Sequence, residues 1–93
     1  MWLRVGLEIN EQEKINIYDE ILELNPADME ALTYKTASLL DLNEDKWALS
    51  LSNQAIKIND EYALAYWQRA CAKAKLDQLD DAVDDILSAI NLS

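Results

Sequence analysis

The amino-acid sequence predicts an all-α protein, and three observations carry that prediction. Only one Gly and one Pro occur among 93 residues, too few for the many tight turns of a small sandwich or barrel. Apolar residues make up 51% of the chain, and many recur at helical spacing. The chain also repeats itself at a period of 34 residues. We therefore expect one small domain built from repeated helical units.

Three segments with similar endings reveal the repeat. Asn25 and Asn59 are 34 residues apart, and so are Asn59 and Ser93. Positions upstream keep the same register, as in the aligned sets Ile15 with Leu49 and Val83, Ala48 with Ala82, and Leu22 with Ile56 and Ile90. Such a period is typical of a stacked array in which each unit buries its apolar face against its neighbours.

The first long helix is predicted over residues 11–24, after a short helical remnant at residues 1–7. Its apolar positions recur at intervals of three and four, at Ile15, Tyr18 and Leu22. Asn10 followed by Glu13 has the spacing of a capping box, in which each side chain accepts the backbone N–H of the other residue.

The second and third helices are predicted over residues 27–41 and 44–58. Asn25 is the expected cap of the second helix, and Pro26 suits its first turn because the missing N–H costs little there. The third helix follows the helical spacing through Ala48, Leu51, Ala55 and Ile58.

The fourth and fifth helices are predicted over residues 61–75 and 79–92. The fourth is Ala-rich, and Asn59 before it repeats the cap without the proline. The fifth has the cleanest periodicity, through Leu79, Ala82, Val83, Ile86, Ala89 and Ile90. Asn43 and Asp77 lie one period apart, and we expect both in the turns between paired helices.

A helix–turn–helix unit of this length resembles the tetratricopeptide repeat (TPR) family. The third unit carries the resemblance at Tyr66, Ala70, Leu76, Asp77, Ala82 and Ala89, and the second at Leu32, Thr36, Leu39, Ala48 and Ala55. The resemblance implies a TPR-like α-solenoid, a short right-handed superhelix of antiparallel helix pairs. It divides the single domain 1–93 into a partial repeat over 1–25 and two repeats over 26–59 and 60–93.

Several positions depart from the family pattern. Lys14 and Ile21 stand where the family usually keeps small residues, and Ser52 stands where it prefers an aromatic ring. Asp45 replaces a usual aromatic or Leu, and we expect Trp47 to fill that space.

The two ends of the array look different in the sequence, since terminal repeats need a polar outer face. The last helix has an acidic run that we expect to form such a face, at Asp80, Asp81, Asp84 and Asp85. The first end is apolar, and we predict an oligomer interface or homodimer seam there, at Trp2, Leu3, Val5 and Leu7.

The resemblance implies a non-enzymatic scaffold that binds a peptide or helix in a concave groove lined by the first helix of each pair. The peptide-binding positions would be Thr33, Tyr34, Ala37, Leu40, Leu64, Trp67, Gln68, Cys71 and Lys75. Trp67 and Tyr34 would be aromatic anchors in this apolar groove. The alternative is that these rings pack within the superhelix.

One TPR subclass clamps the C-terminal carboxylate of chaperone tails with Lys, Asn and Arg on the groove helices. The matching positions offer no such set, since they hold Glu30, Thr33, Tyr34, Ala37, Leu64, Trp67, Gln68 and Cys71. Chaperone-tail binding in that mode is therefore not expected. Arg69, Lys73 and Lys75 remain as groups able to hold one acidic group of a ligand.

Composition excludes several other functions. A net charge of −10 argues against binding nucleic acid or an anionic membrane, because both need a positive face. The absence of His removes the commonest general base, and no motif points to a metal or cofactor. Asp41, Asn43 and Asp45 imitate the start of a calcium loop, but Lys46 stands where its Gly is needed.

With the single Cys71, no disulfide framework is possible within the chain, and a cytoplasmic location is expected. Two alternatives to a peptide-binding scaffold stay open: a homo-oligomerisation module that uses the N-terminal face, and a fragment of a longer repeat protein. An enzyme that uses carboxylates has no support, because acids are expected on solvated helix faces.

Overall fold

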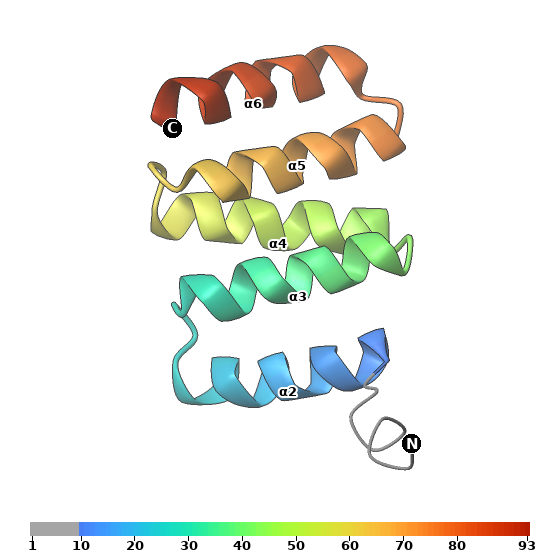
Figure 1. Cartoon of the computed structure of the whole chain (residues 1–93), viewed down its shortest axis with the longest axis vertical. Helices are drawn as coiled ribbons and strands as arrows, with labels where there is room; N and C mark the ends of the chain where they lie inside the picture. The colour runs from blue at the N-terminus through green and yellow to red at the C-terminus, as the bar shows by residue number, and fades with distance from the viewer. Residues whose placement is uncertain (1–9) are drawn as a thin grey trace, which may run out of the picture.

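The computed structural model describes residues 10–93, which fold into five α-helices with no strand among them. The helices are α2 (Glu11–Leu24), α3 (Met29–Asp41), α4 (Asp45–Ile58), α5 (Ala63–Lys75) and α6 (Leu79–Leu92). They lie as successive antiparallel rungs in chain order, with α2 at one end of the stack and α6 at the other (Figure 1). The predicted all-α array of helix pairs is confirmed.

The C-terminal ends of the helices were predicted more accurately than their N-terminal starts. The bounds of α2 and α6 match the prediction, and all five helices end where the periodicity ends. The capping box at the start of α2 is confirmed: Glu13 N donates to Asn10 Oδ1 at 2.8 Å, and Asn10 N donates to Glu13 Oε1 at 3.3 Å.

α3 begins at Met29, two residues later than predicted, because Asn25 is not its cap. Asn25 is the C-cap of α2, and its side chain instead accepts the backbone N–H of Ala27 at 3.2 Å. The N-cap is Asp28, which accepts from Ala31 N at 3.0 Å. The same turn recurs one period later, where Asn59 accepts from Glu61 N at 3.0 Å and α5 begins only at Ala63.

The turns within each helix pair explain how the chain manages with so little glycine. Asn43 and Asp77 adopt left-handed backbone angles, with φ of 61° and 65°. Two hydrogen bonds close the first of these turns, from Glu44 N to Leu39 O at 2.8 Å and from Asn43 N to Leu40 O at 3.0 Å. This is the Schellman pattern, and Asn and Asp tolerate it better than most residues besides Gly.

Small residues let the helices approach one another closely. Ala48, Ala65, Ala72 and Ala89 are all fully buried. Larger side chains fill the space around them, chiefly Ile15, Leu32 and Leu39. The small residues of the repeat pattern therefore lie at helix contacts, which explains their spacing. None of the helices among residues 10–93 is long and apolar enough to cross a membrane.

The structure corrects the expected polar face of α6. Asp85 is only 3% exposed, so the acidic face holds Asp80, Asp81 and Asp84 alone. Beside that face α6 exposes an apolar stripe, made of Leu79, Val83, Leu87 and Ile90. The reason is that apolar residues occupy two sides of α6, and the rest of the array buries only one of them.

The structure tests the expectation for Trp47 but not those for the N-terminal residues. Trp47 does not fill the space near Asp45, because its side chain is 60% exposed. The helical remnant at residues 1–7 and the proposed interface residues Trp2, Leu3, Val5 and Leu7 lie outside the described residues.

Candidate functional site

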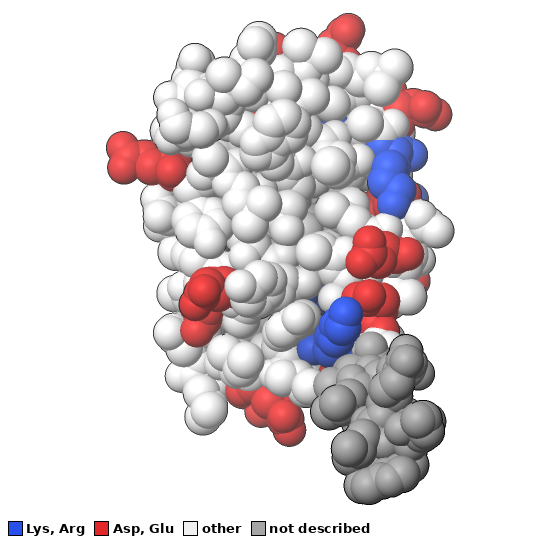
Figure 2. Space-filling model, viewed as in Figure 1, with Lys and Arg blue, Asp and Glu red and all other residues white. Residues whose placement is uncertain are grey.

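The candidate site is a surface on the first helices of the two complete pairs, α3 and α5, which contact each other. Glu30 matches Leu64 in the repeat and Ala37 matches Cys71, and all four are exposed, whereas Tyr34 and Trp67 are one position out of register with each other. We call this the α3–α5 surface, and its exposed residues are Glu30, Tyr34, Ala37, Asp41, Leu64, Trp67, Cys71 and Ala74. Figure 2 shows a face of the molecule with uncharged side chains across its middle and acidic groups mostly toward its margins.

Aromatic side chains dominate the α3–α5 surface. Tyr34 is 51% exposed and Trp67 is 42% exposed, values well above those of core residues. The ring of Tyr34 also packs against Tyr18 of α2, with centroids 5.8 Å apart. The small residues Ala37 and Cys71 follow the aromatic residues by one helical turn and leave room beside them. The surface thus combines large apolar side chains with small residues beside them.

Thr33 and Gln68, two predicted peptide contacts, serve the fold instead. They are 1% and 7% exposed. Gln68 Nε2 donates to the backbone oxygen of Thr33 at 2.7 Å, which ties α5 to α3. The hydroxyl of Thr33 donates to its own helix, to Met29 O at 2.9 Å and Glu30 O at 3.1 Å. Both side chains are thus buried, with the Thr33 hydroxyl bonded within α3 and the Gln68 amide joining α5 to α3.

Lys75 joins the ends of three helices. Its Nζ donates to the backbone oxygen of Leu40 at 2.7 Å and lies 3.2 Å from Oδ1 of Asp45. Leu40 itself is half-buried. The positive charge of Lys75 therefore has partners within the protein, and it supports the α3–α5 surface at one end.

The other basic residues of α5 are also engaged, contrary to the expectation that they could hold an acidic ligand. Arg69 donates to both carboxylate oxygens of Asp85, from Nε at 2.9 Å and from Nη2 at 2.7 Å, and donates to Asn53 at 3.0 Å. Lys73 Nζ lies 3.0 Å from the same carboxylate. The buried carboxylate of Asp85 therefore pairs with two of the three basic residues that were expected to hold an acidic ligand.

The charges in this cluster stabilise one another. Burial alone raises the pKa of Asp85, but the hydrogen bonds and positive charges of Arg69 and Lys73 outweigh it and hold that pKa below its usual value. The hydrogen bond from Arg69 to Asp85 raises the pKa of Arg69, while burial opposes the shift. The cluster thus stays ionised at neutral pH and pairs α5 with α6.

No family model matches the chain, and no curated relative does either. Solved structures do match. The first TPR of Spaghetti (RPAP3), bound to the HSP90 peptide SRMEEVD, has a TM-score of 0.86 at 25% sequence identity, over 89% of this chain and 66% of that one. The first TPR domain of human RPAP3 gives the same TM-score and identity, with 65% of its chain covered.

A bacterial protein gives a similar match. The MamA structure from Desulfovibrio magneticus RS-1 has a TM-score of 0.80 at 25% identity, over 89% of this chain and 47% of that one. This chain is a TPR-like repeat domain. It spans about two thirds of the RPAP3 domains and about half of the MamA chain.

Two features of this TPR-like domain were not predicted from the sequence. One is the buried cluster around Asp85. A signal for it was present, since Asp85 follows Ala82 by three residues and precedes Ala89 by four, which places all three on one helix face. The other is a pocket between α2 and α4, whose shape depends on how three helices pack.

Proposed function

We propose that this TPR domain is a non-enzymatic interaction scaffold that binds an apolar peptide or helix of a partner protein across the α3–α5 surface. The observation that carries the proposal is the exposure of Tyr34, Leu64 and Trp67 on matching helices of successive pairs. Exposed aromatic residues beside small ones are typical of interface hot spots. The structural neighbour bound to a peptide supports a peptide as the class of partner.

The charges near the α3–α5 surface favour an apolar ligand over an acidic one. Glu30 and Asp41 are exposed acidic groups of this surface, and the exposed Lys75 lies at its end. Lys75 is paired with Asp45, while Arg69 and Lys73 are paired with Asp85. An acidic peptide such as the one on the RPAP3 domain therefore meets repulsion here, and we expect this domain to prefer a partner without acidic groups.

The cellular location and the class of partner are also proposed. Cys71 is exposed and unpaired as a free thiol, which suits a reducing compartment, so we propose a cytoplasmic location. A protein or peptide is the proposed partner, and no cofactor is required for such binding.

Two tryptophans allow a matched test. Peptides are selected from a display library on the immobilised domain, and the affinity of the best one is measured by calorimetry. Trp67→Ala should weaken binding by about 2 kcal/mol or more, because a buried aromatic anchor is lost. Trp47→Ala on α4 removes a more exposed indole away from the α3–α5 surface and should leave the affinity unchanged. The proposal fails if Trp67→Ala binds as tightly as the wild type.

Self-association is a separate proposal. It is supported by a surface on α6 and not by the N-terminal face that was predicted from the sequence. The apolar stripe of α6 contains Leu79, Val83, Leu87 and Ile90, all more than half exposed, and apolar patches of this kind mark interfaces. Sedimentation velocity over a concentration series tests it. Self-association that disappears in Val83→Lys supports the α6 stripe, and a constant monomer mass at high concentration removes the proposal.

A further inference from the structure

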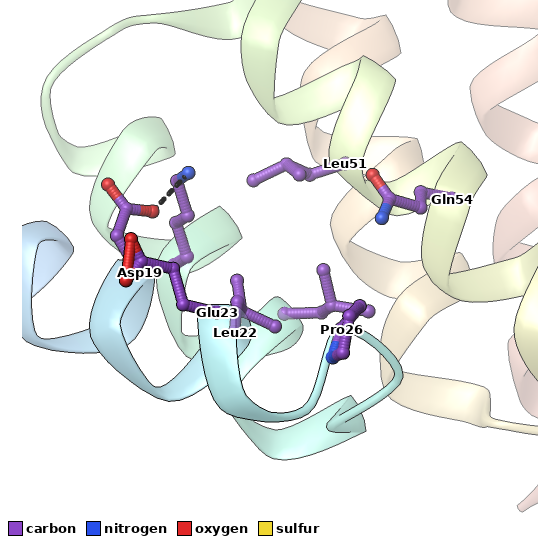
Figure 3. Close-up of a pocket in the computed structure, with 8 residues that line it drawn as sticks. Asp19, Leu22, Glu23, Pro26, Leu51 and Gln54 are labelled. Atoms are coloured by element: carbon purple, nitrogen blue, oxygen red, sulfur yellow. Dashed lines mark ion pairs between the residues drawn. The ribbon is translucent and has the colours of Figure 1, made fainter.

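A pocket of about 500 Å³ lies on the side of α3 opposite Tyr34 and Ala37. We call it the first groove, and its lining residues are Asp19, Leu22, Glu23, Pro26, Leu32, Lys35, Leu51 and Gln54. Figure 3 shows the residues of α2 and α4 on either side of an open space, with Pro26 between them. Its volume falls within the range of roughly 300–1,000 Å³ that is usual for ligand sites.

The repeat supplies an internal counterpart one period later, which we call the second groove. Its residues are Asn53, Ile56, Lys57, Asp60, Tyr66, Arg69, Asp85 and Ser88. There the ring of Tyr66 extends toward the preceding turn, and its hydroxyl donates to Asp60 O at 2.9 Å. The guanidinium of Arg69 lies 5.5 Å from the centre of that ring and is held by Asn53 and Asp85. The ring of Tyr66 and the guanidinium of Arg69 therefore connect the two sides of the second groove.

The first groove keeps the cation but has no ring at the position of Tyr66. The ring near Lys35 is that of Trp47 on α4, whose centre lies 5.9 Å from Lys35 Nζ. Lys35 stands at the position of Arg69 and forms an ion pair with Asp19, which stands at the position of Asn53. Leu32 replaces Tyr66 and is 99% buried as part of the core, so it does not reach outward as the tyrosine does. The open space of the first groove is thus the place where the second groove holds an aromatic side chain.

We propose that the first groove binds a tyrosine side chain presented by a protein partner. Leu22, Leu32 and Leu51 provide apolar walls for the ring. Lys35, which also contacts Trp47 and pairs with Asp19, provides a cation at the position from which Arg69 contacts Tyr66. Glu23 and Gln54 at the rim provide acceptors for a phenolic hydroxyl. This site lies on another face of α3 from the α3–α5 surface and does not depend on the proposed function.

The acidic rim also defines what the first groove rejects. Glu23 is exposed at the edge of the pocket, and Asp19 already holds Lys35. A phosphorylated tyrosine would bring a doubly negative group next to these carboxylates, so we expect the unmodified phenol alone to bind.

The test uses capped amino acids and amide NMR spectra of the full chain. Titration with N-acetyl-tyrosinamide should shift the signals of Leu22, Leu51 and the Gln54 side chain. N-acetyl-leucinamide and the phosphorylated analogue should bind at least about tenfold more weakly, which is the effect expected from losing about 1.4 kcal/mol. Equal binding of the leucine probe would overturn the assignment to a ring.

Two variants block the first groove by different routes. Leu32→Tyr copies the second groove and fills the space from the α3 side, whereas Gln54→Trp covers it from an exposed rim position that leaves the core intact. Each should reduce tyrosine binding at least about tenfold. Trp67→Ala should leave it unchanged, which separates this site from the α3–α5 surface. The proposal is overturned if the wild type gives no shifts in the first groove, or if a folded blocking variant binds as well as the wild type.

Discussion

The first and second grooves share one repeat register but are held together by different chemistry. In the first, Leu32 and Leu51 meet as apolar groups, and the charges of Lys35 and Asp19 pair beside them. In the second, Asp85 is buried at the position of Leu51 and takes hydrogen bonds from Arg69. Fully buried alanines, such as Ala48 and Ala65, let the helices of the array approach closely.

This difference indicates which positions the fold leaves free to change. A buried carboxylate is costly in itself, and it is tolerated only where cations compensate it. Arg69 and Lys73 do so for Asp85, and Tyr66 fills the space beside them. The first groove has no such set of side chains, and it keeps a pocket instead. The two grooves thus differ in chemistry at matching repeat positions.

The largest effect is expected from breaking the second groove. Asp85→Ala removes the carboxylate and leaves Arg69 and Lys73 without their shared partner, so it should lower the free energy of unfolding by about 3 kcal/mol. Urea denaturation measures this loss. The neighbouring exposed acid gives the control, and Asp84→Ala should change the stability by less than about 0.5 kcal/mol. Equal effects of the two variants would mean that the ion pairs of Asp85 do not contribute to the free energy of unfolding.

The pH dependence of the same cluster has a definite sign. The pKa of Asp85 in the folded protein lies below its usual value of 3.8, so the ionised carboxylate stabilises the folded state above that pH. This stabilisation should be lost as the pH falls through the lowered pKa. The stability difference between wild type and Asp85→Asn should therefore be constant above about pH 5 and shrink at lower pH. A difference that grows on acidification would contradict the pairing.

A smaller effect is expected where α5 supports the end of α3. Lys75→Met removes the hydrogen bond to Leu40 O and the ion pair with Asp45, and it should cost about 1 kcal/mol because the group is partly exposed. Lys57→Met, at an exposed position of α4, is the control and should be close to neutral. Thermal unfolding of both variants measures the contrast. A loss in Lys57→Met as large as in Lys75→Met would show that the lost charge, and not the contact, matters.

The smallest predicted effect concerns the two matching turns. Asn43→Gly and Asp77→Gly should each raise the stability by about 0.5 kcal/mol, because glycine adopts the left-handed conformation without a side-chain clash. Asp77→Val should instead lower it, since a β-branched residue is disfavoured there. Chemical denaturation of the three variants decides this. A stabilising valine would mean that the turn does not require its left-handed conformation.

Much of the fold was predictable because helical periodicity and the repeat both survive in the sequence. The apolar spacing gave the bounds of α2 and α6, and Asn43 and Asp77 were placed in the correct turns. The first residues of α3 and α5 were harder to predict, since Asn25 and Asn59 each form a local turn before the helix begins. An asparagine makes either a cap or such a turn with the same side-chain oxygen, so its presence alone does not decide between them.

The candidate site was predictable in part. Repeat register placed Tyr34 and Trp67 on matching helices, and both are exposed as a binding surface requires. The same register included Thr33 and Gln68, yet these face the contact between α3 and α5. Which of two adjacent positions faces outward depends on a small rotation of each helix, and periodicity does not specify it. The pairing of Asp85 was hidden for a related reason, because an acidic run looks like a solvated face.

The central claim is that the α3–α5 surface binds the partner. The most direct test follows the indole N–H signals of Trp67 and Trp47 in one NMR titration with a selected peptide, after assignment by the two alanine variants. The claim predicts that the Trp67 signal shifts with the titration while the Trp47 signal stays in place. A shift of the Trp47 signal with an unmoved Trp67 signal would contradict the claim and place the partner on the opposite side of the array.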